Sequence, residues 1–296
     1  MDAPHFDLRD QFASLQCSGF NPFTQGSCNA CAAASVASIV SILACISHGR
    51  NITFSAQRIW DCYDGSCAQG VMMNDFLDSI LLGPKASWIL QPLVPAHGRS
   101  INMSNYSECS GLGEERDRLF SIVNHKFGIP SQSSTNNNGN LRALQRYLRH
   151  HGPVMGVLPM SPGDLDAFSH WKNGTFPFQP SQNSGPPIIF HALTIIGWEN
   201  RSGEMAWLVL NSMGPAWGAD GIGLVKAPFE DNWYSFTLGG GGQRGDLLLL
   251  SDIPIATPQM LHSTKDNQRQ RDLIVLVVTA FSMLAIGGGF CAWAHF

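Results

Sequence analysis

The run from Ala32 to Leu43 is small or apolar at nearly every position. A helix without a polar face has no side to turn towards water, so this run predicts a helix that lies inside the domain. Met72 to Leu82 and Gly113 to His125 are two further candidate helices. Residues 1–120 are therefore expected to be mainly helical.

Short apolar runs dominate the second half of the chain. Their length is typical of buried strands, and they cover residues 154–158, 192–198, 207–211 and 221–226. Helices followed by strands predict an α+β fold of two lobes. The mainly helical lobe would cover residues 1–120 and the mainly β lobe residues 121–250. A site between two such lobes is a common place for a binding cleft.

The C-terminal end has a different pattern. Residues 273–293 carry no charged side chain, and a helix of this length would span the ~30 Å hydrocarbon core of a bilayer. The polar stretch 251–272, which contains two prolines, is typical of a stalk. We therefore expect one transmembrane helix near the C-terminus, which would tether the preceding domain to a membrane.

Composition narrows the class of protein. The chain has 296 residues, of which 44% are hydrophobic and 14% charged. A chain of this kind can bury a large core, which excludes a disordered protein. The net charge is −4 and there is no run of five basic residues, so we expect no nucleic-acid partner. The pattern leaves the oligomeric state open.

Cys31 stands at the N-terminus of the first predicted helix. The unpaired backbone N–H groups and the helix dipole favour an anion there, so the thiol should have a lowered pKa and could act as a nucleophile. Ser27 is a candidate N-cap of this helix. Gln25 is close enough in the chain to place its side-chain amide beside the sulfur.

Two later residues could complete a catalytic group, because a nucleophilic cysteine needs a base and the base needs an orienting partner. His191 opens one apolar strand and Asn211 ends another. Adjacent strands could bring the two side chains together. Taken singly, each residue has an ordinary structural explanation, as a hydrogen-bonded core histidine or a structural thiol. The combination favours catalysis.

Three motifs surround these residues: Gln25-Gly26-Ser27-Cys28 with Cys31, Phe190-His191-Ala192, and Trp207-Leu208-Val209-Leu210-Asn211-Ser212 with Trp217-Gly218. Three shorter matches support them, at Phe6 to Gln11, Phe54 to Gln57 and His151 to Val154. On these motifs the chain resembles the papain-like cysteine peptidases over roughly residues 5–235. Within that family it is most similar to the cathepsin B-like branch.

The resemblance implies a role for each matching residue. Cys31 would attack the scissile carbonyl as a thiolate, His191 would protonate the leaving amine, and Asn211 would hold the His191 ring. Gln25 and the backbone N–H of Cys31 would stabilise the oxyanion. The backbone of Gln69 and Gly70 would pair with the substrate chain.

Three positions depart from the family pattern. Ala32 and Ala34 stand where the family has aromatic residues, and Met213 stands where a tryptophan covers the bond between histidine and asparagine. Loss of this cover would admit water to that bond and weaken the pairing. The alternative to an active peptidase is therefore a catalytically weak or inactive papain-fold scaffold or binding protein of a membrane or virion.

The sequence has eight cysteines. The resemblance implies three disulfides, Cys17–Cys45, Cys28–Cys67 and Cys62–Cys109, with Cys31 as the nucleophile and Cys291 in the C-terminal apolar run. From the sequence alone, six cysteines allow fifteen pairings. The alternatives are reduced thiols in a cytosolic protein, or zinc at Cys28-x-x-Cys31 and Cys62-x4-Cys67. We expect no metal and no other cofactor.

Signals for the cellular location disagree. Basic residues before the apolar run favour a cytoplasmic domain, and they are Lys265, Arg269 and Arg271. Three disulfides instead require an oxidising compartment, and five glycosylation sequons agree with it, at Asn51, Asn102, Asn105, Asn173 and Asn200. We expect a lumenal, extracellular or virion compartment, with the membrane orientation left open.

The N-terminal end adds one more expectation. Residues 1–7 contain no apolar signal region, and no inhibitory pro-segment precedes the matching region. We expect either a fragment of a longer precursor or a tail-anchored protein made without these segments.

The resemblance implies hydrolysis of peptide bonds in polypeptide substrates by a membrane-tethered cysteine endopeptidase. The cathepsin B-like branch carries a disulfide-bound loop with adjacent histidines that grips a substrate's C-terminal carboxylate. The corresponding stretch 91–100 has one histidine, His97, and no cysteine. We therefore expect a cleft open at both ends, although Arg99 could still offer a positive charge to a carboxylate.

Overall fold

The computed structural model describes residues 4–49, 51–63, 65–81, 99–101, 122–128, 137–178, 189–201, 203–226 and 233–238. Its helices are α1 (Leu8–Gln11), η1 (Ala13–Leu15), η2 (Ser18–Phe20), α2 (Cys31–His48), α3 (Ala56–Tyr63), α4 (Met73–Leu81), α6 (Asn137–His151) and α7 (Pro162–Ser169). Its strands are β1 (His5–Asp7), β2 (Ile122–Gly128), β3 (Val154–Met160), β4 (Thr175–Phe176), β5 (Ile189–Arg201), β6 (Glu204–Leu210), β7 (Ile222–Val225) and β8 (Trp233–Leu238).

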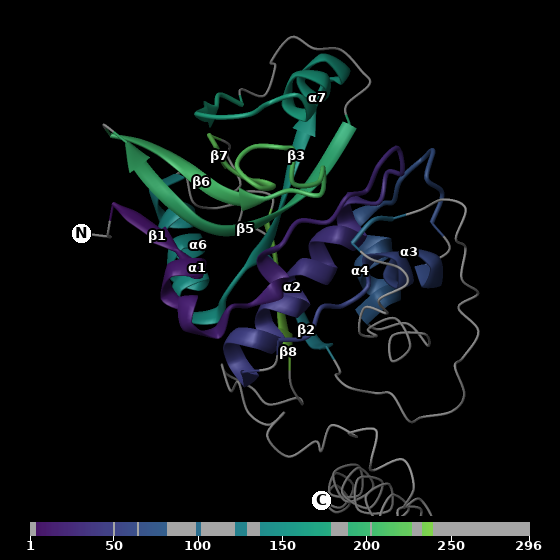
Figure 1. Cartoon of the computed structure of the whole chain (residues 1–296), viewed down its shortest axis with the longest axis horizontal. Helices are drawn as coiled ribbons and strands as arrows, with labels where there is room; N and C mark the ends of the chain where they lie inside the picture. Colours follow the sequence, from purple (N-terminus) through teal and green to yellow (C-terminus); the bar gives the residue numbers. More distant parts are fainter. Residues whose placement is uncertain are drawn as a thin grey trace, which may run out of the picture. The chain divides into compact units, whose positions relative to one another are not determined.

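The described strands form one sheet in the order β2-β8-β3-β5-β6-β7-β4, and β1 pairs with β5 outside this path. Neighbouring strands are antiparallel except for the parallel pair of β4 and β7. Figure 1 shows helices α2, α3 and α4 on one side of the molecule, in purple and blue, and the long green strands β5 and β6 on the other. The sequence prediction of a mixed α and β fold is confirmed.

Helix α2 joins the helical part of the molecule to the sheet. All side chains from Ala32 to Cys45 are buried, as the uniformly apolar pattern predicts. The helix packs against α3 on one face and against β5 on another. Gly49 ends it in the left-handed conformation, with φ of 63°, which glycine adopts without strain. A rigid, buried helix therefore begins at the candidate nucleophile.

Within the described ranges the buried residues form three clusters, and the two larger ones meet at β5. Helices α2, α3 and α4 share one core, to which Met155 of β3 and Ala192 of β5 also contribute. The sheet encloses the other core, which is rich in aromatic side chains and includes Trp198, Trp207 and Trp217. Because Ala192 belongs to the helical core while its strand lines the aromatic core, β5 lies where the two meet.

The four predicted strands are confirmed in β3, β5, β6 and β7, and the helix predicted from Met72 is confirmed in α4. The helix predicted over residues 113–125 is wrong for its last four residues. Residues 122–128 form strand β2, whose backbone pairs antiparallel with β8. Pairing with a strand more than 100 residues away overrides the local preference for a helix. Residues 113–121 lie outside the described part.

None of the helices in the described ranges is both long and apolar enough to cross a membrane. The predicted stalk, residues 251–272, and the predicted transmembrane helix, residues 273–293, lie outside these ranges.

Candidate active site

Cys31 is the first residue of α2. The N-cap is Ala30, whose side chain cannot cap the helix, so the predicted N-cap role of Ser27 is wrong. The free N–H groups of the first turn are therefore left for an anion. Cys31 is a free thiol and keeps part of its surface exposed to solvent. On the other side of the sulfur, the backbone N–H of Ala192 lies 3.4 Å away.

His191 and Asn211 meet because β5 and β6 are paired, with Thr194 opposite Leu210. The His191 Nε2 atom lies 2.9 Å from Asn211 Oδ1, and both residues are almost fully buried, at 3% and 2% exposure. Asn211 Oδ1 also accepts a hydrogen bond from the backbone N–H of Ser212 at 2.8 Å. That N–H fixes which amide atom faces His191, so Nε2 must carry the proton and Nδ1 is left for Cys31.

The thiol of Cys31 and the ring of His191 also interact, and each shifts the pKa of the other. Burial by itself raises the pKa of the Cys31 thiol, but the hydrogen bond and positive charge of His191, together with the N–H groups of Ala192 and Ala32, bring it below its ordinary value. Burial likewise lowers the pKa of His191, yet the bonds to Cys31 and Asn211 raise it above its ordinary value. The opposite shifts favour a thiolate beside an imidazolium.

Gln25 is buried, and hydrogen bonds of its side chain and backbone hold it. Its Nε2 donates to the carbonyl oxygen of Cys28 at 2.9 Å, its Oε1 accepts from the hydroxyl of Ser212, and its backbone N–H donates to the carbonyl oxygen of Ser212 at 2.8 Å. The amide is therefore oriented with Nε2 towards the Cys28–Cys31 segment. Its second N–H is free to point at an oxyanion formed beside Cys31.

Ser212 is a site residue that the sequence analysis did not single out. Its backbone N–H orients Asn211 and its hydroxyl orients Gln25. One residue thus connects the partner of His191 to the candidate oxyanion donor. The only signal in the sequence is that Ser212 directly follows Asn211, which gives no hint of a contact with a residue 187 positions earlier.

An aromatic side chain does contact His191, although Met213 replaces the tryptophan of the family pattern. The ring of Phe168, in α7, lies edge-on to the His191 ring with 5.7 Å between centroids. Phe168 in turn packs on Trp217 at 4.9 Å, whose indole N–H donates to the Phe168 carbonyl oxygen at 2.6 Å. His191 therefore has an apolar neighbour, Phe168, on a helix that no sequence pattern placed beside it.

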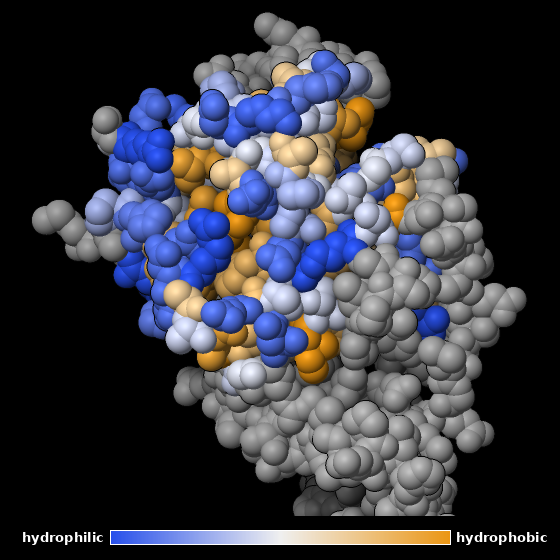
Figure 2. Space-filling model, in the orientation of Figure 1, coloured by the Kyte–Doolittle hydropathy of each residue, from blue (hydrophilic) through white to orange (hydrophobic). Residues whose placement is uncertain are grey.

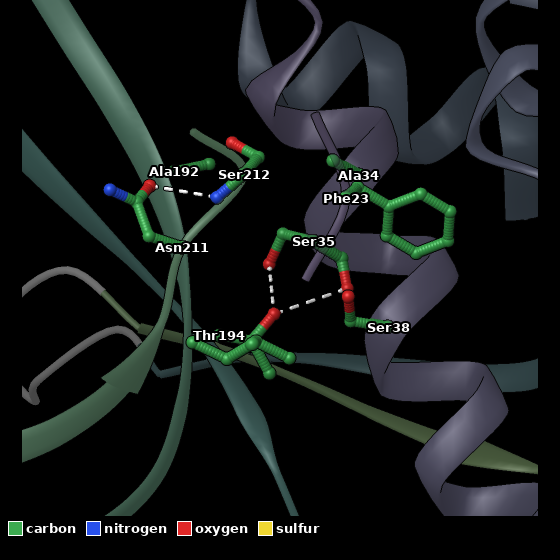
Figure 3. Close-up of a pocket in the computed structure, with 9 residues that line it drawn as sticks. Phe23, Ala34, Ser35, Ser38, Ala192, Thr194, Asn211 and Ser212 are labelled. Atoms are coloured by element: carbon green, nitrogen blue, oxygen red, sulfur yellow. Dashed lines mark hydrogen bonds between the residues drawn. The ribbon is translucent and has the colours of Figure 1, made fainter. Parts of the chain in front are cut away.

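A polar contact fixes the helix against the sheet just behind the site (Figure 3). The hydroxyl groups of Ser35 and Thr194 lie 3.0 Å apart, and both side chains are buried. Ser35 is one turn after Cys31, and Thr194 is two residues after Ala192. This contact therefore sets the position of α2 along β5. Ala34 and Asn211 line the same small pocket as this contact, which leaves no space for a water molecule, although the family pattern has a bulky aromatic residue at position 34.

The predicted substrate-binding segment lies beside the nucleophile segment. The Cys28–Cys67 disulfide links the two, and Asn29 adds bonds from its backbone N–H to the Cys67 carbonyl and from Nδ2 to the Ala68 carbonyl, both at 3.0 Å. Gly70 has φ of +73°, a conformation that favours glycine. Gln69 and Gly70 are thus held near Cys31, and their role in substrate binding stays a prediction.

Arg99, whose positive charge could serve a substrate carboxylate, has its guanidinium hydrogen-bonded within the fold. Its guanidinium donates to the carbonyl oxygens of Asn21 at 2.8 Å and Ser18 at 2.6 Å, and to the Thr53 hydroxyl at 2.9 Å. Its backbone carbonyl accepts from the N–H of Thr24 at 2.9 Å. Arg99 therefore braces the segment that leads into Gln25. His97 lies outside the described residues.

Two of the three implied disulfides are confirmed, Cys17–Cys45 and Cys28–Cys67. Cys62 is also disulfide-bonded, and its partner lies outside the described residues, so the Cys62–Cys109 pair stays a prediction. These bonds exclude the alternative of reduced thiols and remove Cys28, Cys62 and Cys67 as zinc ligands. They also indicate an oxidising compartment.

Comparison with known proteins gives one consistent family. Residues 3–230 match the family described as papain family cysteine protease. The "Cathepsin B-like cysteine proteinase 1" of Haemonchus contortus is 24% identical over 265 residues, which cover 80% of this chain and 72% of that protein. The "Viral cathepsin" of the Lymantria dispar multicapsid nuclear polyhedrosis virus is 25% identical over 225 residues, covering 75% of this chain and 54% of that protein.

Other relatives match over shorter stretches. The chain covers 36% and 43% of the length of two cathepsin B-like cysteine proteinases of Ostertagia ostertagi. Among solved structures, the digestive procathepsin L 3 of the Tenebrio molitor larval midgut superposes with a TM-score of 0.57 at 17% identity, over 79% of this chain and 69% of that chain. That likeness shows a shared fold. On the family match across most of its length, the chain belongs to the papain family of cysteine proteases.

Proposed function

We propose that this protein is a cysteine endopeptidase in which Cys31 and His191 are the catalytic pair. The observation that carries the proposal is the buried His191, whose Nε2 lies 2.9 Å from Asn211 Oδ1 and whose interaction with Cys31 lowers the pKa of Cys31 and raises that of His191. A pair with these shifts holds a nucleophile and a proton donor ready at the same pH.

In this mechanism the Cys31 thiolate attacks the carbonyl carbon of a peptide bond. The carbonyl oxygen becomes an oxyanion, which accepts hydrogen bonds from Gln25 Nε2 and from the N–H of Cys31, each contributing ~3 kcal/mol in comparable sites. His191 then donates its proton to the leaving nitrogen, the C–N bond breaks, and a thioester forms on Cys31. Water, deprotonated by His191, attacks the thioester carbon and releases the acid and the Cys31 thiolate.

Exposed apolar side chains support a polypeptide substrate. Within the described ranges, three large apolar residues are exposed: Leu15, Met72 and Phe190. Two of them flank the proposed site along the chain, since Met72 follows Gly70 by two residues and Phe190 precedes His191. Apolar side chains of a bound peptide would cover them and remove their surface from water. We infer that substrates carry apolar residues near the cleaved bond.

Labelling with an epoxysuccinyl peptide tests the catalytic pair. The probe should modify Cys31 of the oxidised protein, and the adduct should be absent in Cys31→Ala and form much more slowly in His191→Ala. Intact mass and peptide mapping give the site, and the labelling rate against pH gives the apparent pKa values. A rate at Cys31 no faster than that of a free cysteine would overturn the proposal and favour an inactive papain-fold scaffold.

We also propose cleavage of internal bonds rather than removal of C-terminal dipeptides. The support is the stretch 91–100, which has one histidine and no cysteine, and Arg99 within it, whose guanidinium donates to two backbone carbonyls and a hydroxyl of the fold. A peptide with a free C-terminus and its amidated twin should be cut at similar rates. A large preference for the free acid would contradict this and point to a carboxylate clamp.

The membrane tether remains a proposal, supported by the uncharged run of residues 273–293. The full chain should fractionate with membranes after an alkaline carbonate wash. A chain truncated at Ser263 should be recovered without detergent. Retention of the truncated chain on washed membranes would show that another surface carries the attachment.

A further inference from the structure

The sequence contains asparagine sequons for glycosylation, which have no role in the proposed peptidase mechanism. Three of them, at Asn51, Asn173 and Asn200, fall on asparagines that the structure describes. The disulfides of the domain form in oxidising compartments, which in eukaryotic cells include the site of N-linked glycosylation. A folded protein can carry a glycan only where the asparagine amide faces solvent and is not needed by the fold. The structural environment of each asparagine therefore indicates whether it could carry a glycan.

Asn51 is exposed at the surface, but its amide is part of the fold. Its Oδ1 accepts from the backbone N–H of Ser18 at 2.7 Å, and its Nδ2 donates to the carbonyl oxygen of Gln16 at 3.0 Å. Gln16 has φ of 48°, the left-handed conformation that non-glycine residues rarely adopt. The Asn51 amide thus stabilises the unfavourable backbone conformation of Gln16 through its bonds to residues 16 and 18. A sugar on Nδ2 would displace the amide from these contacts.

Asn173 is in the opposite situation. It is exposed in the turn between α7 and β4, where it precedes Gly174, whose φ is +86°. Its side chain makes no hydrogen bond with any residue in the described ranges. The chain on either side is anchored, because Lys172 Nζ donates to the Ala216 carbonyl at 2.6 Å and Thr175 is paired with Leu224. The Asn173 amide can therefore be modified without loss of a contact.

The surrounding surface agrees with this placement. Helix α7 stands at the top of Figure 1, and the surface over it in Figure 2 is mainly hydrophilic. A sugar chain there would remain in water. At Asn200, by contrast, the backbone N–H donates to the Pro4 carbonyl at 2.7 Å, and the third residue of the sequon lies outside the described residues. We draw nothing from it.

We propose that Asn173 is a site of N-linked glycosylation and that Asn51 in the folded protein is not. In the reaction, Asn173 Nδ2 forms a bond to the first sugar carbon of a lipid-diphosphate-linked oligosaccharide, the lipid diphosphate leaves, and Nδ2 gives up one proton. Thr175 supplies the hydroxyl that the sequon requires. Nothing in this proposal depends on catalysis by Cys31.

The test uses the full chain translated into the lumen of a eukaryotic secretory pathway behind a cleavable signal. Peptide N-glycosidase treatment of the folded fraction in ¹⁸O-water converts each glycosylated asparagine to labelled aspartate. The peptide containing residue 173 should carry the label and the peptide containing residue 51 should not. This result comes from the unmodified sequence, so it does not require any variant to fold.

Matched variants complete the test. Asn173→Gln and Thr175→Ala should each remove the glycan from this turn, Thr175→Ser should retain it, and Asn51→Gln should leave the glycan mass unchanged. An unlabelled residue 173 in the folded fraction would overturn the proposal. So would a label at residue 51, because it would show that the hydrogen bonds of Asn51 do not protect its amide.

Discussion

The two sides of the candidate active site are fixed in different ways. Cys31 belongs to a helix that covalent bonds hold near both ends, through Cys28–Cys67 just before the thiol and Cys17–Cys45 near the C-terminus of α2. His191 lies on a sheet whose sequence, from residue 110 to residue 290, contains no cysteine at all. Backbone pairing of β5 with β3 and β6, and contact with Phe168, hold it instead.

The difference follows from the secondary structure that carries each residue. The nucleophile segment is a loop leading into a helix, and a loop has few backbone hydrogen bonds of its own, so cross-links restrict it most effectively. The histidine lies on strand β5, where β3 pairs with His191 itself and β6 pairs from Thr194 onward, so neighbouring strands already restrain the backbone around it. Covalent bonds are therefore found where the backbone offers least restraint. Four predictions test this comparison.

The largest effect is expected from removing a cross-link on the Cys31 side. Replacing Cys28 and Cys67 together by serine opens a loop with a sequence separation of 39 residues, for which chain entropy gives a loss of about 4 kcal/mol of unfolding free energy. Urea unfolding of the oxidised protein measures it. The Cys17 and Cys45 double replacement is the matched control: it should cost a similar amount, because its separation is 28 residues, but with less effect on turnover.

A loss below about 1 kcal/mol for the Cys28 and Cys67 pair would mean that hydrogen bonds of Asn29 hold the segment without the disulfide. The two sides of the site would then be restrained by the same kind of interaction.

On the His191 side, Asn211→Ala should lower kcat/KM by about 10²-fold, the lower end of what general acid–base groups contribute. The bond to Asn211 raises the pKa of His191, so its loss lowers that pKa. His191 must stay protonated for the leaving nitrogen, hence the alkaline limb of the pH profile should move to lower pH. The acid limb, set by Cys31 deprotonation, should move less.

Asn200→Ala, on the exposed end of β5, is the control for this change and should leave both limbs in place. An unchanged alkaline limb in Asn211→Ala would mean that the protonation of His191 depends on Cys31 alone.

Ser212→Ala should reduce kcat about tenfold, because Gln25 loses the hydroxyl that orients its amide towards the oxyanion. Alkylation of Cys31 by iodoacetamide forms no oxyanion, so its rate should stay the same. Ser212→Thr, which keeps a hydroxyl, should recover much of the loss. Equal losses in hydrolysis and alkylation would instead assign Ser212 to the positioning of the catalytic pair through Asn211.

The smallest effect is expected where the two sides meet. Thr194→Val keeps the shape of the side chain and removes the hydroxyl that contacts Ser35, leaving a buried hydroxyl without its partner at a cost of about 1–2 kcal/mol of stability. Thermal unfolding measures the loss, and Thr194→Ser should retain most of the stability. An unchanged unfolding temperature in Thr194→Val would show that apolar packing alone holds α2 against β5.

Several elements were predictable because their signals are local. A helix apolar on all faces has to be buried, and short apolar runs between turns have to be strands, so α2, β3, β5, β6 and β7 follow from the pattern. The prediction for the end of the helix over residues 113–125 is wrong because the structure of this segment does not depend on a local signal. Its residues 122–125 pair with β8, and no local pattern contains the partner strand.

The reactive residue types, their order and the motifs around Cys31, His191 and Asn211 can be read from the sequence, because each of these is a property of a short stretch. The contacts that surround these residues depend on the fold. Ser212 contacts Gln25 across 187 positions, Thr194 contacts Ser35 across 159, and the Arg99 guanidinium donates to the carbonyl oxygens of Ser18 and Asn21. The physical reason is that hydrogen bonds act over about 3 Å in space, a distance that folding sets and sequence separation does not record.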